Sequence, residues 1–148
     1  MYSLNNEILE SFSEIHKAFD RLIKLDADRV GITVVQLKAL YQLSNSPNIG
    51  LGELAEKLRL TNSTVSGVID RLVYSELVER VIPPENRRSV SIHVTEKGKK
   101  LLDKLYSSDS IFIKKLNEVL DLPEEEIAHL LSLHKLVLSK LKLEEEKF

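Results

Sequence analysis

Four small polar residues in succession, Thr61, Asn62, Ser63 and Thr64, open the stretch LTNSTVSGVIDRL, residues 60–72. Short hydroxyl and amide side chains can hydrogen-bond to phosphate oxygens or to the edges of nucleic-acid bases. One residue of this kind is enough to cap the start of a helix. The other three have no such structural explanation, which makes the stretch a candidate binding surface.

The residues that follow predict a helix with one apolar and one polar side. At 100° per residue, its apolar side chains gather on one face: Val65, Val68, Ile69, Leu72 and Val73. The opposite face carries Ser63, Gly67 and Tyr74, flanked by Thr64, Ser66, Asp70 and Arg71. A helical glycine costs about 1 kcal/mol relative to alanine, so Gly67 implies close packing or the close approach of a partner. The guanidinium of Arg71 suits guanine or phosphate, and the whole profile favours a helix that enters a DNA major groove by its N-terminal end.

A second basic site follows in the loop PPENRR, between the strand-like runs 77–82 and 89–94. The second run alternates, which predicts that Val90, Ile92 and Val94 face inward. Paired prolines stiffen the loop, and Asn86, Arg87 and Arg88 lie at its tip. A basic hairpin directly after a recognition helix is typical of a wing that reaches the adjacent minor groove. The alternative is an ordinary solvated basic turn.

The remaining elements are predicted to be helices that position these two sites. A long amphipathic helix over 4–29 ends at Gly31, a capping box of Thr33 and Gln36 opens the second helix, and a short third helix begins at Leu51. Two short helices joined by a turn of about three residues form a helix-turn-helix. In the second helix the side chains expected inside are Leu37, Leu40, Tyr41 and Leu43.

Two further helices are predicted after the hairpin. Thr95 caps a helix that is expected to run over 96–120, and Pro123 takes the first position of the last helix. The fold class is therefore mainly α with a small β-hairpin wing, an α/β winged helix of about six helices. The chain is expected to form one domain, with the winged helix-turn-helix over 33–100 and helical parts at 1–32 and 101–148.

Composition excludes several classes of protein. The 148 residues include no cysteine, which excludes disulfide scaffolds, cysteine-ligated zinc and thiol oxidation switches. The first residues have neither a basic lead nor an apolar signal core, and no apolar run approaches membrane-spanning length, so a cytoplasmic protein with no membrane partner is expected. The net charge is −2, but the middle third, residues 51–100, is the only net-positive part.

The run LGELAEKLRLTNSTVSGVIDRL, followed by LVERVIPPENRRSVSIHVTEKGKKLL, resembles the MarR family of bacterial transcription regulators. The order of helices, wing and threonine-x-x-glycine helix start agrees over nearly the whole chain. The resemblance implies a homodimer with interleaved first and last helices and two winged helices set for a palindromic operator. The polar face of the helix and the resemblance together predict that double-stranded DNA is bound by Thr61, Asn62, Ser63, Thr64, Ser66, Gly67, Arg71, Asn86, Arg87 and Arg88.

The resemblance also implies a repressor that a small aromatic or phenolic effector releases from DNA. The candidate ligand residues are Phe12, His16, Phe19 and Tyr41, although an aromatic stripe at helical spacing is more often core. Three positions depart from the family pattern. Asn86 and Pro83 stand where aspartates are usual, and Glu76 stands where a glycine commonly ends the recognition helix, which predicts a strained residue or a different C-cap.

Three other functions have weaker support. His129 and His134 are five residues apart and point about 140° apart on a helix, so they cannot chelate one metal ion from the same face. His16 could join either of them in a folded dimer, but zinc needs a closed tetrahedral set, and neither a metal nor a cofactor is expected. A winged helix that binds protein rather than DNA would carry an acidic or apolar recognition face. An enzyme is not expected, because the sequence has no nucleophile elbow, phosphate loop or metal-ligand cluster.

Overall fold

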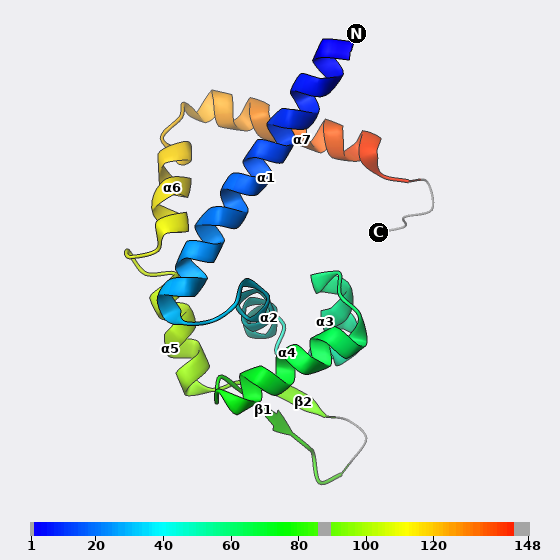
Figure 1. Cartoon of the computed structure of the whole chain (residues 1–148), viewed down its shortest axis with the longest axis vertical. Helices are drawn as coiled ribbons and strands as arrows, with labels where there is room; N and C mark the ends of the chain where they lie inside the picture. Colours follow the sequence, from blue (N-terminus) through cyan, green and yellow to red (C-terminus); the bar gives the residue numbers. More distant parts are fainter. Residues whose placement is uncertain (1, 86–89, 144–148) are drawn as a thin grey trace. The chain divides into compact units, whose positions relative to one another are not determined.

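The computed structural model describes residues 2–85 and 90–143, with seven helices and one two-stranded sheet in those ranges (Figure 1). The elements, in chain order, are α1 Tyr2–Val30, α2 Val34–Asn45, α3 Leu51–Leu58, α4 Asn62–Tyr74, β1 Val78–Val81, β2 Ser91–Val94, α5 Glu96–Leu105, α6 Ile111–Leu120 and α7 Glu124–Leu141. No helix among the described residues is long and apolar enough to cross a membrane. The chain divides into two compact units, Met1–Phe112 and Ile113–Phe148.

The core of the first unit lies between α2, α3, α4, α5 and the sheet. Apolar residues at helical spacing bury one face of each short helix, and Ile92 closes the core from the sheet. The side chains of Leu40, Leu43, Leu54, Val65, Ile69 and Leu72 are almost fully buried. This packing holds α4 by one face and leaves the other face of the helix in solvent.

Local signals in the sequence set the helix boundaries. Thr33 Oγ1 accepts from the Gln36 amide, and the Gln36 side chain accepts from the Thr33 amide, so the predicted capping box is confirmed. Gly31 ends α1 at a φ of +79°, a left-handed conformation that glycine adopts without steric cost. Arg59 ends α3 in the same region, at a φ of +55°, and residues 59–61 form the predicted short turn to α4.

The two strands pair antiparallel, with Val78 opposite Val94 and Val81 opposite Ser91. Ile92 is buried and Val94 is half-buried, as predicted, but the prediction for Val90 was wrong: this residue lies before the strand and is exposed. Glu76 has a φ of +62°, so of the two alternatives for this position the strained residue is confirmed.

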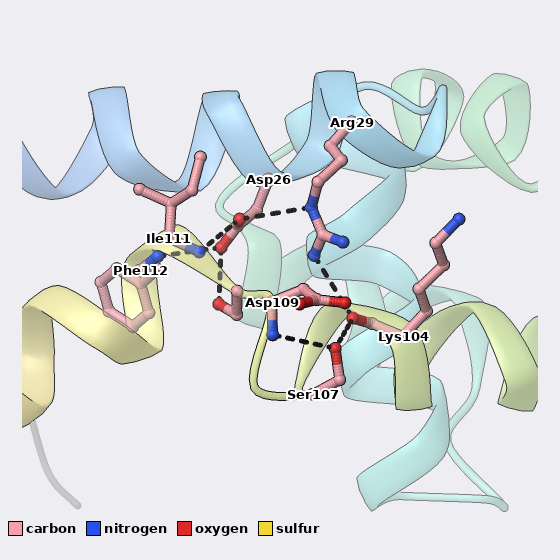
Figure 2. A network of polar contacts seen from close by, with 8 residues as sticks. Asp26, Arg29, Lys104, Ser107, Asp109, Ile111 and Phe112 are labelled. Atoms are coloured by element: carbon pink, nitrogen blue, oxygen red, sulfur yellow. Dashed lines mark hydrogen bonds and ion pairs between the residues drawn. The ribbon is translucent and has the colours of Figure 1, made fainter.

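The single helix predicted over 96–120 was wrong, because the chain breaks it into α5 and α6 (Figure 2). The Ser107 hydroxyl donates to the Lys104 carbonyl at 2.7 Å and accepts from the Asp109 amide at 3.3 Å, which replaces helical hydrogen bonds with a turn. Asp26 on α1 then accepts from the amides of Ile111 and Phe112 and starts the new helix.

The second unit contains most of α6 and all of α7. Pro123 is the N-cap of α7 rather than its first helical residue, a shift of one position. Nearly every side chain of α7 is exposed in the single chain, including Leu130, Leu131, Leu133, Leu136, Leu138 and Leu141. An apolar helix with so many exposed side chains has surface available for contact with another protein chain.

Candidate nucleic-acid interface

Helix α4 presents two chemically different faces, as its sequence predicted. Val65, Val68, Ile69 and Leu72 are buried and Val73 is half-buried. Thr61 to Thr64, Asp70, Arg71 and Tyr74 are exposed, whereas Ser66 and Gly67 are half-buried at the border of the two faces. The structure therefore places all seven predicted site residues of this stretch along one side and one end of a single helix.

The four polar residues at the helix start divide into two pairs. Thr61 is the N-cap, because its hydroxyl oxygen accepts from the Thr64 amide at 3.2 Å. The Thr61 hydroxyl also donates to the Thr64 hydroxyl oxygen at 2.9 Å, so these two side chains satisfy each other. Asn62 and Ser63 have no side-chain hydrogen bond within the described part of the chain. Their donors and acceptors are exposed and available to a ligand at the positive end of the helix.

Gly67 has open space above its backbone. A Cβ atom added at this position would meet no atom within 4 Å, whereas one at Gly98 would lie 2.7 Å from Val94 Cγ1. Packing therefore explains Gly98 but does not explain Gly67. Close approach by a partner molecule, the other explanation that the sequence left for this glycine, stays a prediction.

Two basic residues extend this surface toward the wing. The side chain of Arg71 is exposed and makes no ion pair among the described residues. Arg80 of β1 forms an ion pair and hydrogen bond with Asp70 of α4, which connects the wing strand directly to the recognition helix. Arg80 was not among the predicted site residues; it belongs to a strand with one buried and three exposed residues, a pattern that only the structure reveals. The predicted tip residues Asn86, Arg87 and Arg88 lie outside the described residues.

The four candidate ligand residues are not joined to one another by any ring contact in the described structure. Phe19 meets Phe112 edge to face, with ring centroids 5.8 Å apart, and Tyr41 meets Tyr106 at 6.1 Å. Tyr41 is exposed, so its predicted place inside the core was wrong; its ring packs on a neighbouring ring at the surface. Burial raises the pKa of Tyr106 above its usual value of 10.0, and Tyr41 adds to that shift.

His16 and Phe12, the other two candidates, are exposed on α1. His16 Nε2 lies 3.3 Å from a carboxylate oxygen of Asp20 one turn later, a solvated pair. Tyr106 and Phe112 were missed in the sequence because the segment that holds them was interpreted as continuous helix. Among the described residues, no group of three or more histidine, aspartate or glutamate side chains could hold a metal ion.

A helix-turn-helix followed by a two-stranded hairpin, with a polar outward face on its second helix, defines a winged helix-turn-helix protein. The model of the MarR family matches residues 32–90, which include α2, α3, α4 and the first strand of the hairpin, β1. The chain is 33% identical to the HTH-type transcriptional regulator YsmB of Bacillus subtilis over 68% of each chain. It is 34% identical to the regulator YfiV of the same organism, over 68% of this chain and 62% of YfiV. The chain belongs to the MarR family.

Solved structures show the same fold. A MarR family protein from Bacillus stearothermophilus, 25% identical, superposes with a TM-score of 0.78 over 96% of this chain and 99% of that one. A mutant of MepR from S. aureus, bound to an oligodeoxyribonucleotide, is 24% identical and has a TM-score of 0.61 over 91% and 98% of the two chains. Both alignments extend far beyond the winged helix, so the likeness of fold includes the flanking helices.

Proposed function

We propose that this protein is a transcription regulator that binds double-stranded DNA through α4 and the wing. The observation that carries the proposal is the exposed polar start of α4, where Asn62 and Ser63 are unpaired among the described residues and Gly67 is uncovered. Free backbone amides at a helix start attract phosphate, and small side chains allow the backbone to approach the groove closely. The DNA-bound MepR mutant, which shares this fold, supports the proposal.

The protein acts as a homodimer on a palindromic operator. Two short recognition helices placed by a two-fold axis read two half-sites, which raises affinity without new contacts within each half-site. Support comes from the apolar side chains that the single chain leaves exposed on α1 and α7, such as Ile8, Phe12, Leu138 and Leu141. A second copy would remove this surface from water.

A small aromatic or phenolic effector releases this regulator from DNA, so that it acts as a repressor. The residues proposed to contact the effector are Phe12, His16, Phe19 and Tyr41. Support comes from the aromatic surface of the first unit, where Tyr41 packs on Tyr106 and Phe19 packs on Phe112. A flat aromatic ligand has ring faces and edges to pack against at these pairs.

The test is fluorescence-anisotropy titration of the full chain against a labelled duplex from the region upstream of its own gene. A scrambled duplex of equal length and composition serves as control, and both are measured at two salt concentrations. Binding at least 100-fold tighter to the upstream duplex is expected, since specific sites exceed non-specific ones by about 10³–10⁷. Equal and weak binding that disappears with salt would contradict the proposal and favour a protein partner.

A further inference from the structure

Asp26 is a buried carboxylate at the end of a helix whose other turns are largely in water. It is 4% exposed, and it accepts hydrogen bonds from Ser110, in the link between α5 and α6, and from the first two residues of α6 (Figure 2). The Ser110 hydroxyl donates at 2.7 Å, the Ile111 amide at 2.8 Å and the Phe112 amide at 3.0 Å. The carboxylate thereby satisfies the free amides of Ile111 and Phe112 in the first turn of α6 from a position 85 or more residues earlier in the chain.

Arg29, one turn further along α1, holds the other side of the same break. Its Nη2 donates to the Lys104 carbonyl at 3.3 Å, in the last turn of α5, where carbonyls lack helical partners. Its Nε lies 3.9 Å from Asp26 Oδ1 and is buried without a hydrogen-bond partner in the described structure. Asp26 is the carboxylate that pairs with this guanidinium among the described residues, so the two residues form one group.

Asp26 and Arg29 lie next to the point where the chain enters the winged helix. The chain passes from α1 into the winged helix at Gly31, two residues beyond Arg29, and leaves it through α5, which begins directly after the wing strand β2. Asp26 and Arg29 thus contact both segments that flank the winged helix and, in addition, the start of α6. The last amide that Asp26 binds, that of Phe112, belongs to the last residue of the first compact unit.

We propose that Asp26 and Arg29 form a clamp that joins the end of α1, the end of α5 and the start of α6 into one cooperative element. This clamp makes the two segments that flank the winged helix move together. It is a conformational device separate from the DNA-contacting surface, and its existence does not depend on the proposed DNA binding. A simple helix cap, by contrast, would stabilise only the first turn of α6.

Amide hydrogen exchange measured by NMR on the full chain distinguishes the clamp from a simple helix cap. Four amides report on the three segments: Ile32, which donates to Ala27; Tyr106, which donates to Leu102; and Ile111 and Phe112, which donate to Asp26. In Asp26→Asn, all four are expected to exchange at least tenfold faster, and by similar factors. Asp28→Asn is the matched control, because Asp28 is an exposed aspartate two residues away whose ion-pair partner in the described part of the chain is Lys24, at 2.8 Å.

Faster exchange at Ile111 and Phe112 alone, or no change at any of the four amides, would overturn the clamp. If Asp26→Asn does not fold, Arg29→Gln tests the same element from its other side. Arg29 contacts the Lys104 carbonyl and neither α6 amide, so faster exchange at Ile111 and Phe112 as well as at Tyr106 supports coupling. Faster exchange at Tyr106 alone would overturn it. Duplex binding by the wild-type chain is a separate measurement, so failure of the proposed function is distinguishable from failure of the clamp.

Discussion

The hydroxyl of Thr95 donates to the carbonyl of Glu76 at 2.6 Å and accepts from the amide of Gly98 at 3.1 Å. The Thr95 side chain therefore caps the start of α5 and also binds Glu76, the residue that follows Ser75, the C-cap of α4. Glu76 is in the left-handed region, with a φ of +62°, and its backbone amide bonds to the Val73 carbonyl at 2.9 Å. Tertiary contacts thus fix a turn that the local sequence does not favour.

Replacing Glu76 with glycine is expected to stabilise the fold. A left-handed conformation costs a non-glycine residue about 1–2 kcal/mol, and the gain is partly offset by the greater freedom of glycine in the unfolded chain. A net gain of about 0.5–1 kcal/mol in the free energy of unfolding is expected from urea titration. Glu79→Gly, in the interior of β1, is the control and should destabilise by about 0.5–1 kcal/mol. A lower free energy of unfolding in Glu76→Gly would show that the Glu76 side chain stabilises the fold by more than its left-handed backbone conformation destabilises it.

Much of the fold could be predicted because its signals are local. The capping box at Thr33 and Gln36, the stop at Gly31 and the two faces of α4 each depend on residues within a few turns of one another. The break between α5 and α6 could not be predicted in the same way. Only part of its cause is local: the cluster of Ser107, Ser108, Asp109 and Ser110 favours a turn, but the start of α6 depends on Asp26, more than 80 residues away.

The candidate site likewise combines features that the local sequence predicts with features that depend on tertiary packing. The polar face of α4 follows from helical angle alone, and the structure places it where the angle predicted. The pair of Asp70 and Arg80 depends on how β1 packs against α4, and the exposure of Tyr41 depends on which side of α2 the chain leaves uncovered. Neither relationship has a local sequence signal. The predicted roles of individual DNA-contacting residues stay predictions.

Stability should fall in acid through Asp26. Burial acts to raise the pKa of this carboxyl, but the hydrogen bonds from Ser110, Ile111 and Phe112 and the charge of Arg29 outweigh burial and lower the pKa below 3.8. Because the pKa is lower in the folded state, the ionised group stabilises the fold above its unfolded pKa of about 3.9. That contribution is lost as pH falls through the folded pKa.

Urea unfolding measured between pH 6 and pH 2.5 checks this expectation. Asp26→Asn should be less stable than wild type at pH 6, and the difference should shrink as the pH approaches the acid end of the range. Asp28→Asn should follow the wild-type curve closely, since its partner is a solvated lysine. A constant difference between Asp26→Asn and wild type across the range would mean that the Asp26 charge is not the stabilising feature.

The exposed apolar seam of α1, formed by Ile8, Phe12, Ile15 and Phe19, should form part of the proposed dimer interface. Ile8→Lys removes an apolar side chain worth about 1.5–3 kcal/mol of burial from each of two copies and adds a charge. Dimer dissociation is expected to increase by at least 100-fold, measured by sedimentation velocity over a concentration series. Ser13→Lys, an exposed change on the same helix but off the seam, should leave the dimer intact. Equal effects of the two variants would place the interface elsewhere.

Arg71→Ala should weaken operator binding in a way that identifies its contact. If the guanidinium contacts a phosphate, affinity should fall similarly on upstream and scrambled duplexes, and the slope of log K against log salt should become shallower by about 1. If it contacts a base, the upstream duplex alone should lose about 1–3 kcal/mol. Arg21→Ala, an exposed arginine on α1, is the control. Unchanged binding by Arg71→Ala on both duplexes would remove this residue from the proposed interface.

Gly67→Ala should separate stability from DNA binding. No atom lies within 4 Å of an added Cβ at Gly67 or at Gly52, and neither residue has a positive φ, so alanine at either position should stabilise its helix by up to about 1 kcal/mol. Only at Gly67 would the new methyl group stand between the α4 backbone and the groove. Binding to the upstream duplex should then weaken by about tenfold, the cost of roughly one lost contact of 1–3 kcal/mol. Gly52→Ala should bind like wild type. Because both variants gain stability, weaker binding by Gly67→Ala alone could not come from unfolding, and equal binding would mean that DNA does not approach the backbone at Gly67.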